Sequence, residues 1–409
     1  MNIFLSFVAL LSFCIAANAQ MSPFDSVLKA NSYRLHISEN GTLSGEGATF
    51  ILKKSANAQF VLIGENHNTK EIPEFTTSLF NALNKSYGFK HLALEQDPPM
   101  MRKISSPPYK GNLDSVFSLA RKYPYGFTFV SDEELKMIAA VSGHPAKGNV
   151  VWGCDQSFGL MHVMDEIKSE KRNAVFPDSL IYKISASESS RDLDKNDYMS
   201  NGIKKTDLQA LDKFKTGNPD DEIDFGVASL TMSDSIYSFM FSEKPYEGCA
   251  LRESYMKSRF MDEYKKCVAA GEKYPKAVLK FGTAHIVDGF EPNTGTLNVG
   301  TFVKEFAVAN GMGSFSLNAM IYRTDSSDWN FNQYKHKDVI QLFARNAPVD
   351  HWTIFDLKPV KAFYYDSKMK GILTKEDTSF FENYILAFDA LLLIGNGGDG
   401  SFNACKCPY

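Results

Sequence analysis

Residues 60–97 read FVLIGENHNTKEIPEFTTSLFNALNKSYGFKHLALEQD, and this stretch decides the fold. Its two short apolar runs, residues 60–63 and 91–94, are typical of strands that are buried on both faces. Between them, residues 72–83 repeat apolar side chains at the helical period, which predicts a helix with one apolar face. A strand, a helix and a second strand at this spacing form a βαβ unit, in which the two strands are parallel.

Further segments extend this unit into a larger sheet. Four of them are strand-like: residues 150–152, 277–281, 315–322 and 388–394. A helical period over residues 302–308 precedes the third, and the glycine-rich sequence at 395–398 predicts the end of the folded chain. The predicted class is therefore α/β, a mostly parallel central sheet flanked by helices.

Residues 168–274 differ in character and predict a mainly helical insertion. The segment begins with polar, Ser- and Asp-rich sequence and ends in a helix over residues 247–270. On that helix Arg252 opens a stripe of side chains that share one face, namely Met256, Phe260, Tyr264 and Cys267. Residues 20–409 are many for one compact core and few for three, which predicts one large α/β domain carrying this insertion.

The first 19 residues are predicted to lie outside this domain. An apolar run over residues 3–16 leads to Ala17-Asn18-Ala19, the small-x-small pattern that precedes signal peptidase cleavage. The run is too short for a comfortable membrane span, and no later stretch is apolar for about 18 residues. We therefore expect a signal peptide over residues 1–19, no stable membrane anchor, and an exported protein that is periplasmic or secreted.

Charge and cysteine content narrow the class of partner. Lys and Arg number 44 against 48 Asp and Glu, so the chain lacks the basic excess that nucleic-acid binding requires. We expect a small-molecule substrate, and no feature of the sequence sets the oligomeric state. The cysteines outside the leader are too sparse and odd in number for a disulfide scaffold, and their pairing stays open: Cys154, Cys249, Cys267, Cys405 and Cys407.

Chemically versatile side chains follow four of the predicted strands. Glu65 and His67 follow the first strand, Glu95 the second, Asp155 the third and His285 the fourth. Ligands of parallel sheets bind outside the carboxyl ends of the strands. One such residue would be unremarkable, because Asp and Glu commonly begin loops and cap helices. Together, and with two of the 8 histidines of the chain among them, they predict a functional site.

These residue types favour acid–base chemistry. A neutral His67 can take a proton from water near neutral pH, and Glu65 or Glu95 can hold its other nitrogen and stabilise the imidazolium. His285 is a candidate second acid or base. Arg252 can stabilise an oxyanion or grip a substrate carboxylate or phosphate, and the alternative is a purely structural arginine.

The same residues leave a metal site open. Two Glu, one Asp and two His can ligate Mn, Fe or Zn, although the spacing of Glu65 and His67 is not the i, i+4 pairing of helical zinc sites. The sequence contains no Gly-x-Gly-x-x-Gly, Walker loop or Gly-x-Ser-x-Gly, so nucleotide binding and a serine-hydrolase route lack a motif. The leading prediction is a site without metal or other cofactor.

At these residues the sequence resembles the erythromycin esterase family. Residues 63–67 (IGENH) and 88–95 (GFKHLALE) are similar to the opening of that family, which is shared more loosely with the haem-binding ChaN-like proteins and the TraB/TIKI group. Other matching segments are residues 152–155 (WGCD), 252–256 (RESYM), 282–285 (GTAH), 355–357 (FDL) and 388–390 (FDA). The Gly-Glu-x-His spacing is closer to the ChaN-like proteins, so the resemblance does not extend to a macrolide substrate.

The resemblance implies an esterase-like hydrolase and assigns roles to residues. It makes His67 the general base, Glu65 and Glu95 its carboxylate partners, His285 a further catalytic group, and Arg252 and Asp155 substrate-binding residues. The leading prediction is an exported hydrolase whose His67 activates water to attack an ester or related bond of a small molecule. Two alternatives stay open: a haem- or iron-binding ChaN-like protein with Tyr255 or His285 as ligand, and a metal-dependent TIKI/TraB-like peptidase.

Overall fold

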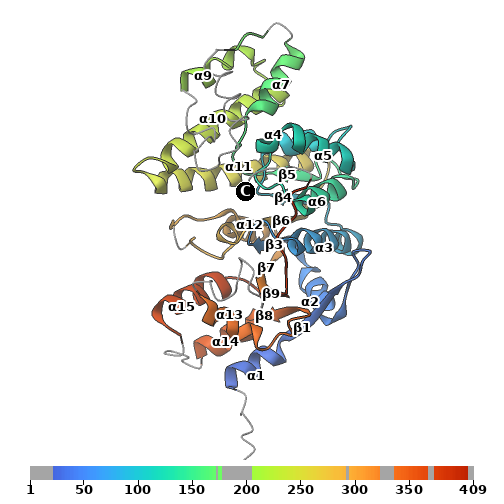
Figure 1. The fold of residues 1–409 in the computed structure, drawn as a ribbon, viewed down its shortest axis with the longest axis vertical. Helices are drawn as coiled ribbons and strands as arrows, with labels where there is room; N and C mark the ends of the chain where they lie inside the picture. The colour runs from blue at the N-terminus through green and yellow to red at the C-terminus, as the bar shows by residue number, and fades with distance from the viewer. Residues whose placement is uncertain are drawn as a thin grey trace, which may run out of the picture.

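One mixed sheet organises the molecule (Figure 1). The computed structural model describes residues 22–171, 174–176, 205–291, 294–322, 336–366 and 373–403. Within these residues nine strands form a sheet in the order β2-β1-β8-β9-β7-β3-β6-β4-β5. Their bounds are β1 Ser32–Ile37, β2 Leu43–Ser44, β3 Ala58–Glu65, β4 His91–Leu94, β5 Val151–Gly153, β6 Ala277–Gly282, β7 Gly313–Tyr322, β8 Trp352–Asp356 and β9 Ala390–Gly395.

The sheet is mostly parallel. All pairings from β9 through β7, β3, β6 and β4 to β5 are parallel, and the pairings of β9 with β8, β8 with β1 and β1 with β2 are antiparallel. The predicted α/β class with a mostly parallel central sheet is therefore confirmed. The β1–β2 pair was not predicted.

Helices cover both faces of the sheet. One face packs against α2 (Gly45–Ser55), α3 (Glu71–Tyr87), α4 (Pro98–Ile104), α5 (Leu113–Lys122) and α6 (Asp132–Ser142). The other packs against α1 (Pro23–Ala30), α11 (Pro245–Ala269), α12 (Val299–Ala309), α13 (Lys337–Ala344), α14 (Leu357–Asp366) and α15 (Lys375–Phe380). Short 3-10 or π-helical turns lie at Pro124–Gly126, Asp212–Phe214, Thr283–His285 and Phe381–Ile385.

Strand β3 shows how the sequence sets these layers. All of its residues are buried, as expected of an apolar strand in the middle of a parallel sheet. Val61 and Ile63 contribute to the core beneath α3 and α6, whereas Phe60 and Leu62 contribute to the core beneath α11 and α12, because side chains alternate along a strand. Helix α3 then ends at Gly88, whose left-handed φ of 72° suits glycine.

The glycine-rich sequence at residues 395–398 was predicted to end the folded chain. In the structure it ends only strand β9. The chain continues in a described conformation to residue 403. Gly400 donates its N–H to the carbonyl oxygen of Asn68 at 2.8 Å, beside the loop that follows His67. The prediction was wrong because glycine breaks a strand without preventing the next residues from finding backbone partners elsewhere.

Helices α7 (Met161–Glu170), α9 (Lys205–Gln209) and α10 (Glu222–Met240) form a small apolar core of their own, at the end of the molecule beyond β5 (Figure 1). The described part of residues 168–274 is mainly helical up to the end of α11, while residues 177–204 lie outside the described residues. The predicted signal peptide at residues 1–19 also lies outside them. Among the helices that the structure describes, none is long and apolar enough to cross a membrane.

The strand order changes direction beside β3. The chain passes from β3 to β4 and β5 on one side, inserts β6 between β3 and β4, and then crosses to β7 on the other side of β3. Parallel sheets bind their ligands at such switch points, beyond the carboxyl ends of the strands. The predicted site residues follow strands at this edge.

Candidate active site

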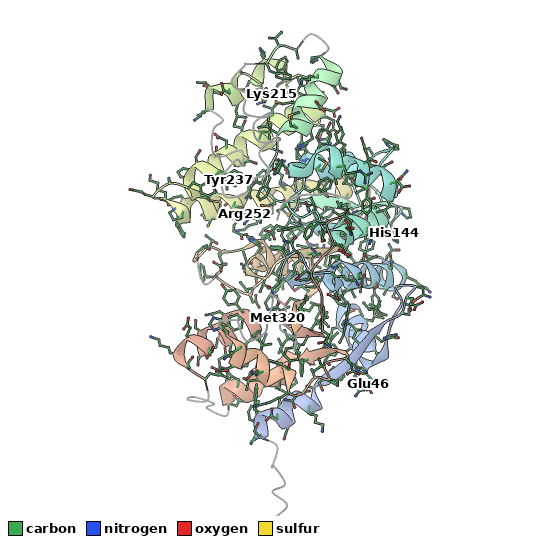
Figure 2. All side chains as sticks on the ribbon, in the orientation of Figure 1. Glu46, His144, Lys215, Tyr237, Arg252 and Met320 are labelled. Atoms are coloured by element: carbon green, nitrogen blue, oxygen red, sulfur yellow. The ribbon has the colours of Figure 1, made fainter. Side chains whose placement is uncertain are left out.

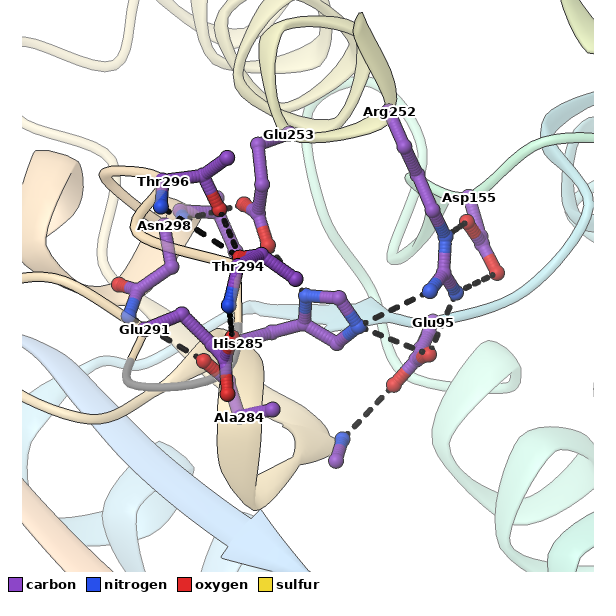
Figure 3. Close-up of polar contacts among 12 residues, drawn as sticks. Glu95, Asp155, Arg252, Glu253, Ala284, His285, Glu291, Thr294, Thr296 and Asn298 are labelled. Atoms are coloured by element: carbon purple, nitrogen blue, oxygen red, sulfur yellow. Dashed lines mark hydrogen bonds and ion pairs between the residues drawn. The ribbon is translucent and has the colours of Figure 1, made fainter. Parts of the chain in front are cut away.

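The predicted site residues meet at the carboxyl edge of β3, β4, β5 and β6. Arg252 reaches them from helix α11 (Figures 1 and 2). Hydrogen bonds and ion pairs connect all of them into one network, drawn in part in Figure 3: Glu65, His67, Glu95, Asp155, Arg252 and His285.

His67 lies between two carboxylates. Its Nδ1 is 3.1 Å from Oε1 of Glu65, and its Nε2 is 3.6 Å from Oε2 of Glu95, too long for a hydrogen bond. The ring stacks on Phe129 with centroids 3.8 Å apart. On Gly282 an added Cβ would lie 2.8 Å from Nε2, so only glycine leaves room for the imidazole there.

The imidazole is more exposed than its partners. The side chain of His67 is 30% exposed, against 4% for Glu65 and 5% for Glu95. The next residue, Asn68, has a left-handed φ of 61°, which is uncommon outside glycine and turns the chain sharply after the histidine. The arrangement presents a reactive ring at the surface of the site and keeps the charges that govern it inside.

Lys280 and Glu134 extend the network on the side of Glu65, and the sequence analysis missed both. The ammonium of Lys280 lies 2.6 Å from Oε1 of Glu65 and 2.8 Å from Oε2 of Glu134, with all three side chains buried. In the sequence Lys280 lies within the apolar run at residues 277–281. A lysine inside a buried strand was the available signal, since lysine is almost never fully buried unless it is paired.

Arg252 anchors the other side of the network. Its guanidinium makes a two-pronged contact with Asp155, from Nε to Oδ1 at 2.9 Å and from Nη2 to Oδ2 at 2.7 Å. It also donates to Oε1 of Glu95 and to Oε1 of Gln156, each at 2.7 Å, and its Nη1 lies 3.2 Å from Nε2 of His285. The fork that was predicted to grip a substrate is thus engaged by the protein's own carboxylate, and its contact with substrate stays a prediction.

His285 is held between two carboxylates as well (Figure 3). Its Nδ1 contacts the carboxylate of Glu253, and its Nε2 is 3.3 Å from Oε1 of Glu95. The second oxygen of Glu253 accepts the backbone N–H of Val299 at 2.8 Å. Glu253 was not predicted as a site residue, although it is the acidic residue that follows Arg252 in the matched helix motif.

Electrostatics fix the charge states of this network. Burial opposes a charge on His67, but the carboxylates of Glu95 and Glu65 outweigh it and raise its pKa above the ordinary 6.5. In His285 the same opposition is overcome by Glu95 and Glu253, which raise its pKa to about 10. Burial alone would raise the pKa of Glu95, yet the neighbouring cations hold it well below its usual range. At neutral pH His285 is therefore an imidazolium paired with two carboxylates.

Glu65 and Arg252 are charged for the same reasons. Burial opposes ionisation of Glu65, and the ammonium of Lys280 together with His67 lowers its pKa all the same. Burial disfavours the guanidinium of Arg252, but Asp155 and Glu95 raise its pKa. Each buried charge of the site thus has an opposite charge in contact with it.

The residues that a metal ion or a haem group would need as ligands already have partners within the protein. Within the described part of the chain no group of three or more His, Cys, Asp or Glu is placed to hold a metal ion. The carboxylates that such an ion would need already contact Lys280 or Arg252. Tyr255, a candidate haem ligand, donates its hydroxyl to Oγ of Ser229 at 3.1 Å, and both ring nitrogens of His285 face carboxylates.

The described cysteines take no part in the network. Cys154, Cys249 and Cys267 are free thiols, and burial raises the pKa of each. A raised pKa leaves little thiolate at neutral pH and therefore little nucleophile. Cys405 and Cys407 lie outside the described residues, so whether they form a disulfide stays open.

No family model matches the chain, and no curated protein matches it in sequence. Solved structures do match its fold. A succinoglycan biosynthesis protein superposes with a TM-score of 0.55 at 13% identity, covering 94% of this chain and 100% of that one. A protein from Bacillus cereus has a TM-score of 0.52 at 14% identity and covers 92% and 98%.

The third match carries the predicted resemblance. Erythromycin esterase EreC, in its open conformation, superposes with a TM-score of 0.52 at 12% identity, over 90% of this chain and 98% of that one. The chain is therefore an α/β protein with the fold of erythromycin esterase, as its sequence predicted. At these identities the likeness establishes the fold and leaves the reaction to the site.

Proposed function

We propose that this protein is a hydrolase in which His67 activates water to attack an ester or related bond of a small molecule. The observation that carries the proposal is the partly exposed imidazole of His67 between the buried carboxylates of Glu65 and Glu95. A histidine so placed is the group most able to exchange a proton with water near neutral pH. Erythromycin esterase, which has the same fold, is named for a reaction of this class.

The first step uses both nitrogens of His67. Nδ1 carries its hydrogen toward Glu65, which fixes the tautomer and leaves the lone pair on Nε2. Nε2 takes a proton from water as the water oxygen bonds to the carbonyl carbon. The resulting imidazolium is stabilised by Glu95, whose Oε2 is already oriented by the backbone N–H of Gly282 at 2.7 Å.

The second step breaks the bond to the leaving group. The carbonyl oxygen becomes an oxyanion, and the guanidinium of Arg252 can stabilise it through Nη1, whose described contact is the ring of His285 and not a carboxylate. When the intermediate collapses, the C–O bond to the alcohol breaks and the alkoxide takes the proton from Nε2 of His67. Water and ester are thereby converted into acid and alcohol, and His67 returns to its neutral form.

The test is His67→Ala measured beside the wild type on a panel of small esters. Loss of a general base should lower kcat by roughly 100- to 10,000-fold, with little change in melting temperature because the ring is partly exposed. His144→Ala is the matched control, since His144 lies at the edge of the molecule (Figure 2) and its Nε2 contacts Oδ1 of Asn81, which is not a residue of the site. Unchanged turnover per folded molecule together with a lower melting temperature would return His67 to a structural role.

The same preparation separates the other readings. Metal that is present in the wild type and lost in His67→Ala would favour the metal-dependent peptidase, and a shifted Soret band with hemin would favour a haem-binding protein. We also propose that the protein acts after export, with a mature chain that begins at Gln20. Mass spectrometry of the exported protein tests this, and a retained Met1 or a lipidated Cys14 would contradict it.

A further inference from the structure

The last described residues of the chain, 398–403, lie against the loop that follows the proposed general base, and we call them the C-terminal strap. Two backbone hydrogen bonds join strap and loop in antiparallel fashion. Lys70 donates its N–H to the carbonyl of Gly398 at 3.0 Å, and Gly400 donates its N–H to the carbonyl of Asn68 at 2.8 Å. The side chain of Glu71 then accepts the N–H of Gly398, at 3.0 and 2.9 Å to its two oxygens.

The strap also binds the start of helix α6. The carbonyl of Ser401 accepts the backbone N–H of Asp132 at 2.6 Å, and the N–H of Ser401 donates to Oε2 of Glu133 at 2.8 Å. The next residue of this helix is Glu134, the carboxylate that holds Lys280. The strap therefore joins the loop after His67 to the first turn of the helix that completes the buried charge network.

These two attachments lie on either side of the imidazole. Phe129, which stacks on the ring, precedes α6 by three residues, and Asn68 directly follows the histidine in its left-handed conformation. Asparagine adopts the left-handed conformation more readily than other non-glycine residues, and the neighbouring backbone helps to hold it here. The hydrogen bond from Gly400 fixes the carbonyl of that residue. The close approach demands glycine, because a Cβ at residue 400 would lie 2.7 Å from Cβ of Ser131.

We propose that the C-terminal strap is a positioning element for His67, which fixes the imidazole between Phe129 and the carboxylates of Glu65 and Glu95. The inference rests on the proposed function insofar as it concerns turnover. The hydrogen bonds described above join the strap to the loop after His67 and to the first turn of α6, so the strap acts on the imidazole through these two elements. A reacting group displaced by about 1 Å can lose two orders of magnitude in rate.

Gly400→Ala is the perturbation that tests it. The methyl group must push apart Ser131 and the loop at Asn68, which shifts His67 without changing any residue of the network. We expect kcat to fall by about 10- to 100-fold, with KM within about threefold. Gly311→Ala is the matched control: its φ of 69° also disfavours alanine, but no atom lies within 4 Å of the added Cβ. This control should lower the melting temperature and leave kcat unchanged.

A conservative pair of variants tests the second attachment. Glu133→Ala removes the acceptor for the N–H of Ser401, whereas Glu133→Gln keeps a side-chain carbonyl oxygen in its place. We expect the Ala variant to lose kcat about fivefold or more and the Gln variant to recover most of it. Equal kcat in both variants and the wild type would contradict the role of this attachment.

A readout independent of hydrolysis distinguishes failure of this inference from failure of the proposed function. The imidazole of His67 can be titrated by NMR in protein labelled at its 8 histidines, with His67→Ala as the assignment control. Displacement from Glu95 and Glu65 should move the pKa of His67 in Gly400→Ala back toward 6.5. If the wild type hydrolyses no ester, such a change still supports the positioning role. An unchanged pKa in Gly400→Ala overturns it, whatever the activity.

Discussion

Replacing Arg252 by lysine should weaken both the fold and the reaction, although the charge is conserved. Arginine reaches Asp155 with two nitrogens and Glu95 with one of them, and both carboxylates are nearly inaccessible to solvent. A lysine ammonium is a point charge and can satisfy only part of this arrangement. The variant therefore leaves a buried carboxylate short of a partner without removing the positive charge.

The contacts set the magnitude of the loss. A hydrogen bond to a charged group contributes about 1.5–3 kcal/mol, and a buried acceptor left unpaired costs more than the bond itself. We expect the free energy of unfolding of Arg252→Lys to fall by about 2–4 kcal/mol. Because Arg252 also orients Glu95 against His67, we expect transition-state stabilisation to fall by roughly 2–4 kcal/mol, or about 30- to 1000-fold in rate.

Urea denaturation and steady-state kinetics on the same preparation measure the two losses. A circular dichroism spectrum like that of the wild type establishes that the variant folds. Turnover and a denaturation midpoint close to those of the wild type would refute the reasoning, because Arg252 would then act only as a positive charge.

A double-mutant cycle with Asp155→Asn measures how much of the loss in Arg252→Lys comes from the two-pronged contact between Arg252 and Asp155. The neutral amide has less need of a two-pronged cation, so Arg252→Lys should cost less stability in the Asp155→Asn background than in the wild type. A coupling of about 0.5–3 kcal/mol is expected for residues in direct contact. Strict additivity would mean that the two side chains do not depend on each other, against the geometry of their contact.

Three further predictions concern the buried charges. Lys280→Met leaves two buried carboxylates without their cation, so the free energy of unfolding measured by urea denaturation should fall by about 3–5 kcal/mol. Lys280 also lowers the pKa of His67, so that pKa should rise in this variant when it is measured by NMR titration. The ratio kcat/KM should increase as His67 loses its proton above pH 6.5 and decrease as His285 loses its own near pH 10, and a flat pH–rate profile would contradict both assignments. The pKa of His285 in the folded protein lies above its unfolded value, so its contribution to stability is complete below pH 6.5. That contribution is lost as the pH rises toward 10, by up to about 1.4 kcal/mol per pH unit. The melting temperatures of the wild type and His285→Gln should therefore converge across this range.

Much of the fold was predictable because its central strands are apolar on both faces. Runs of this kind stand out in a sequence, and their order with helices between them determines a parallel sheet. The β1–β2 hairpin lacks such a run, since one residue of β1 and none of β2 is fully buried. The Asn40-Gly41 pair was the available signal, because Gly41 has a φ of 76° and Asn-Gly is a strong indicator of a hairpin turn.

Some residues of the site could also be predicted from the sequence, and others could not. Residues at strand ends could be predicted to meet, because the carboxyl ends of parallel strands share one edge of the sheet. The contact of Lys280 with Glu65 could not, because it joins residues 215 apart in the chain and depends on the relative register of β3 and β6. Glu134 depends in addition on how helix α6 packs across the sheet, and no local pattern encodes that. The chemistry of strand ends is therefore readable in a sequence, whereas the charges that tune it require the packed structure.

The order of charges across the site explains why His67 is suited to gain and lose a proton. Anionic and cationic side chains alternate through the buried network, from Glu134 and Lys280 to Glu65, then His67, then Glu95. His67 is the member of this sequence whose charge is not permanent at neutral pH, and it is also the exposed one. A proton that arrives on it restores the alternation between two fixed carboxylates, where a low local dielectric strengthens the attraction. Lys280 limits that attraction because its positive charge lowers the pKa of His67, so an imidazolium there is stabilised less than the two carboxylates alone would stabilise it.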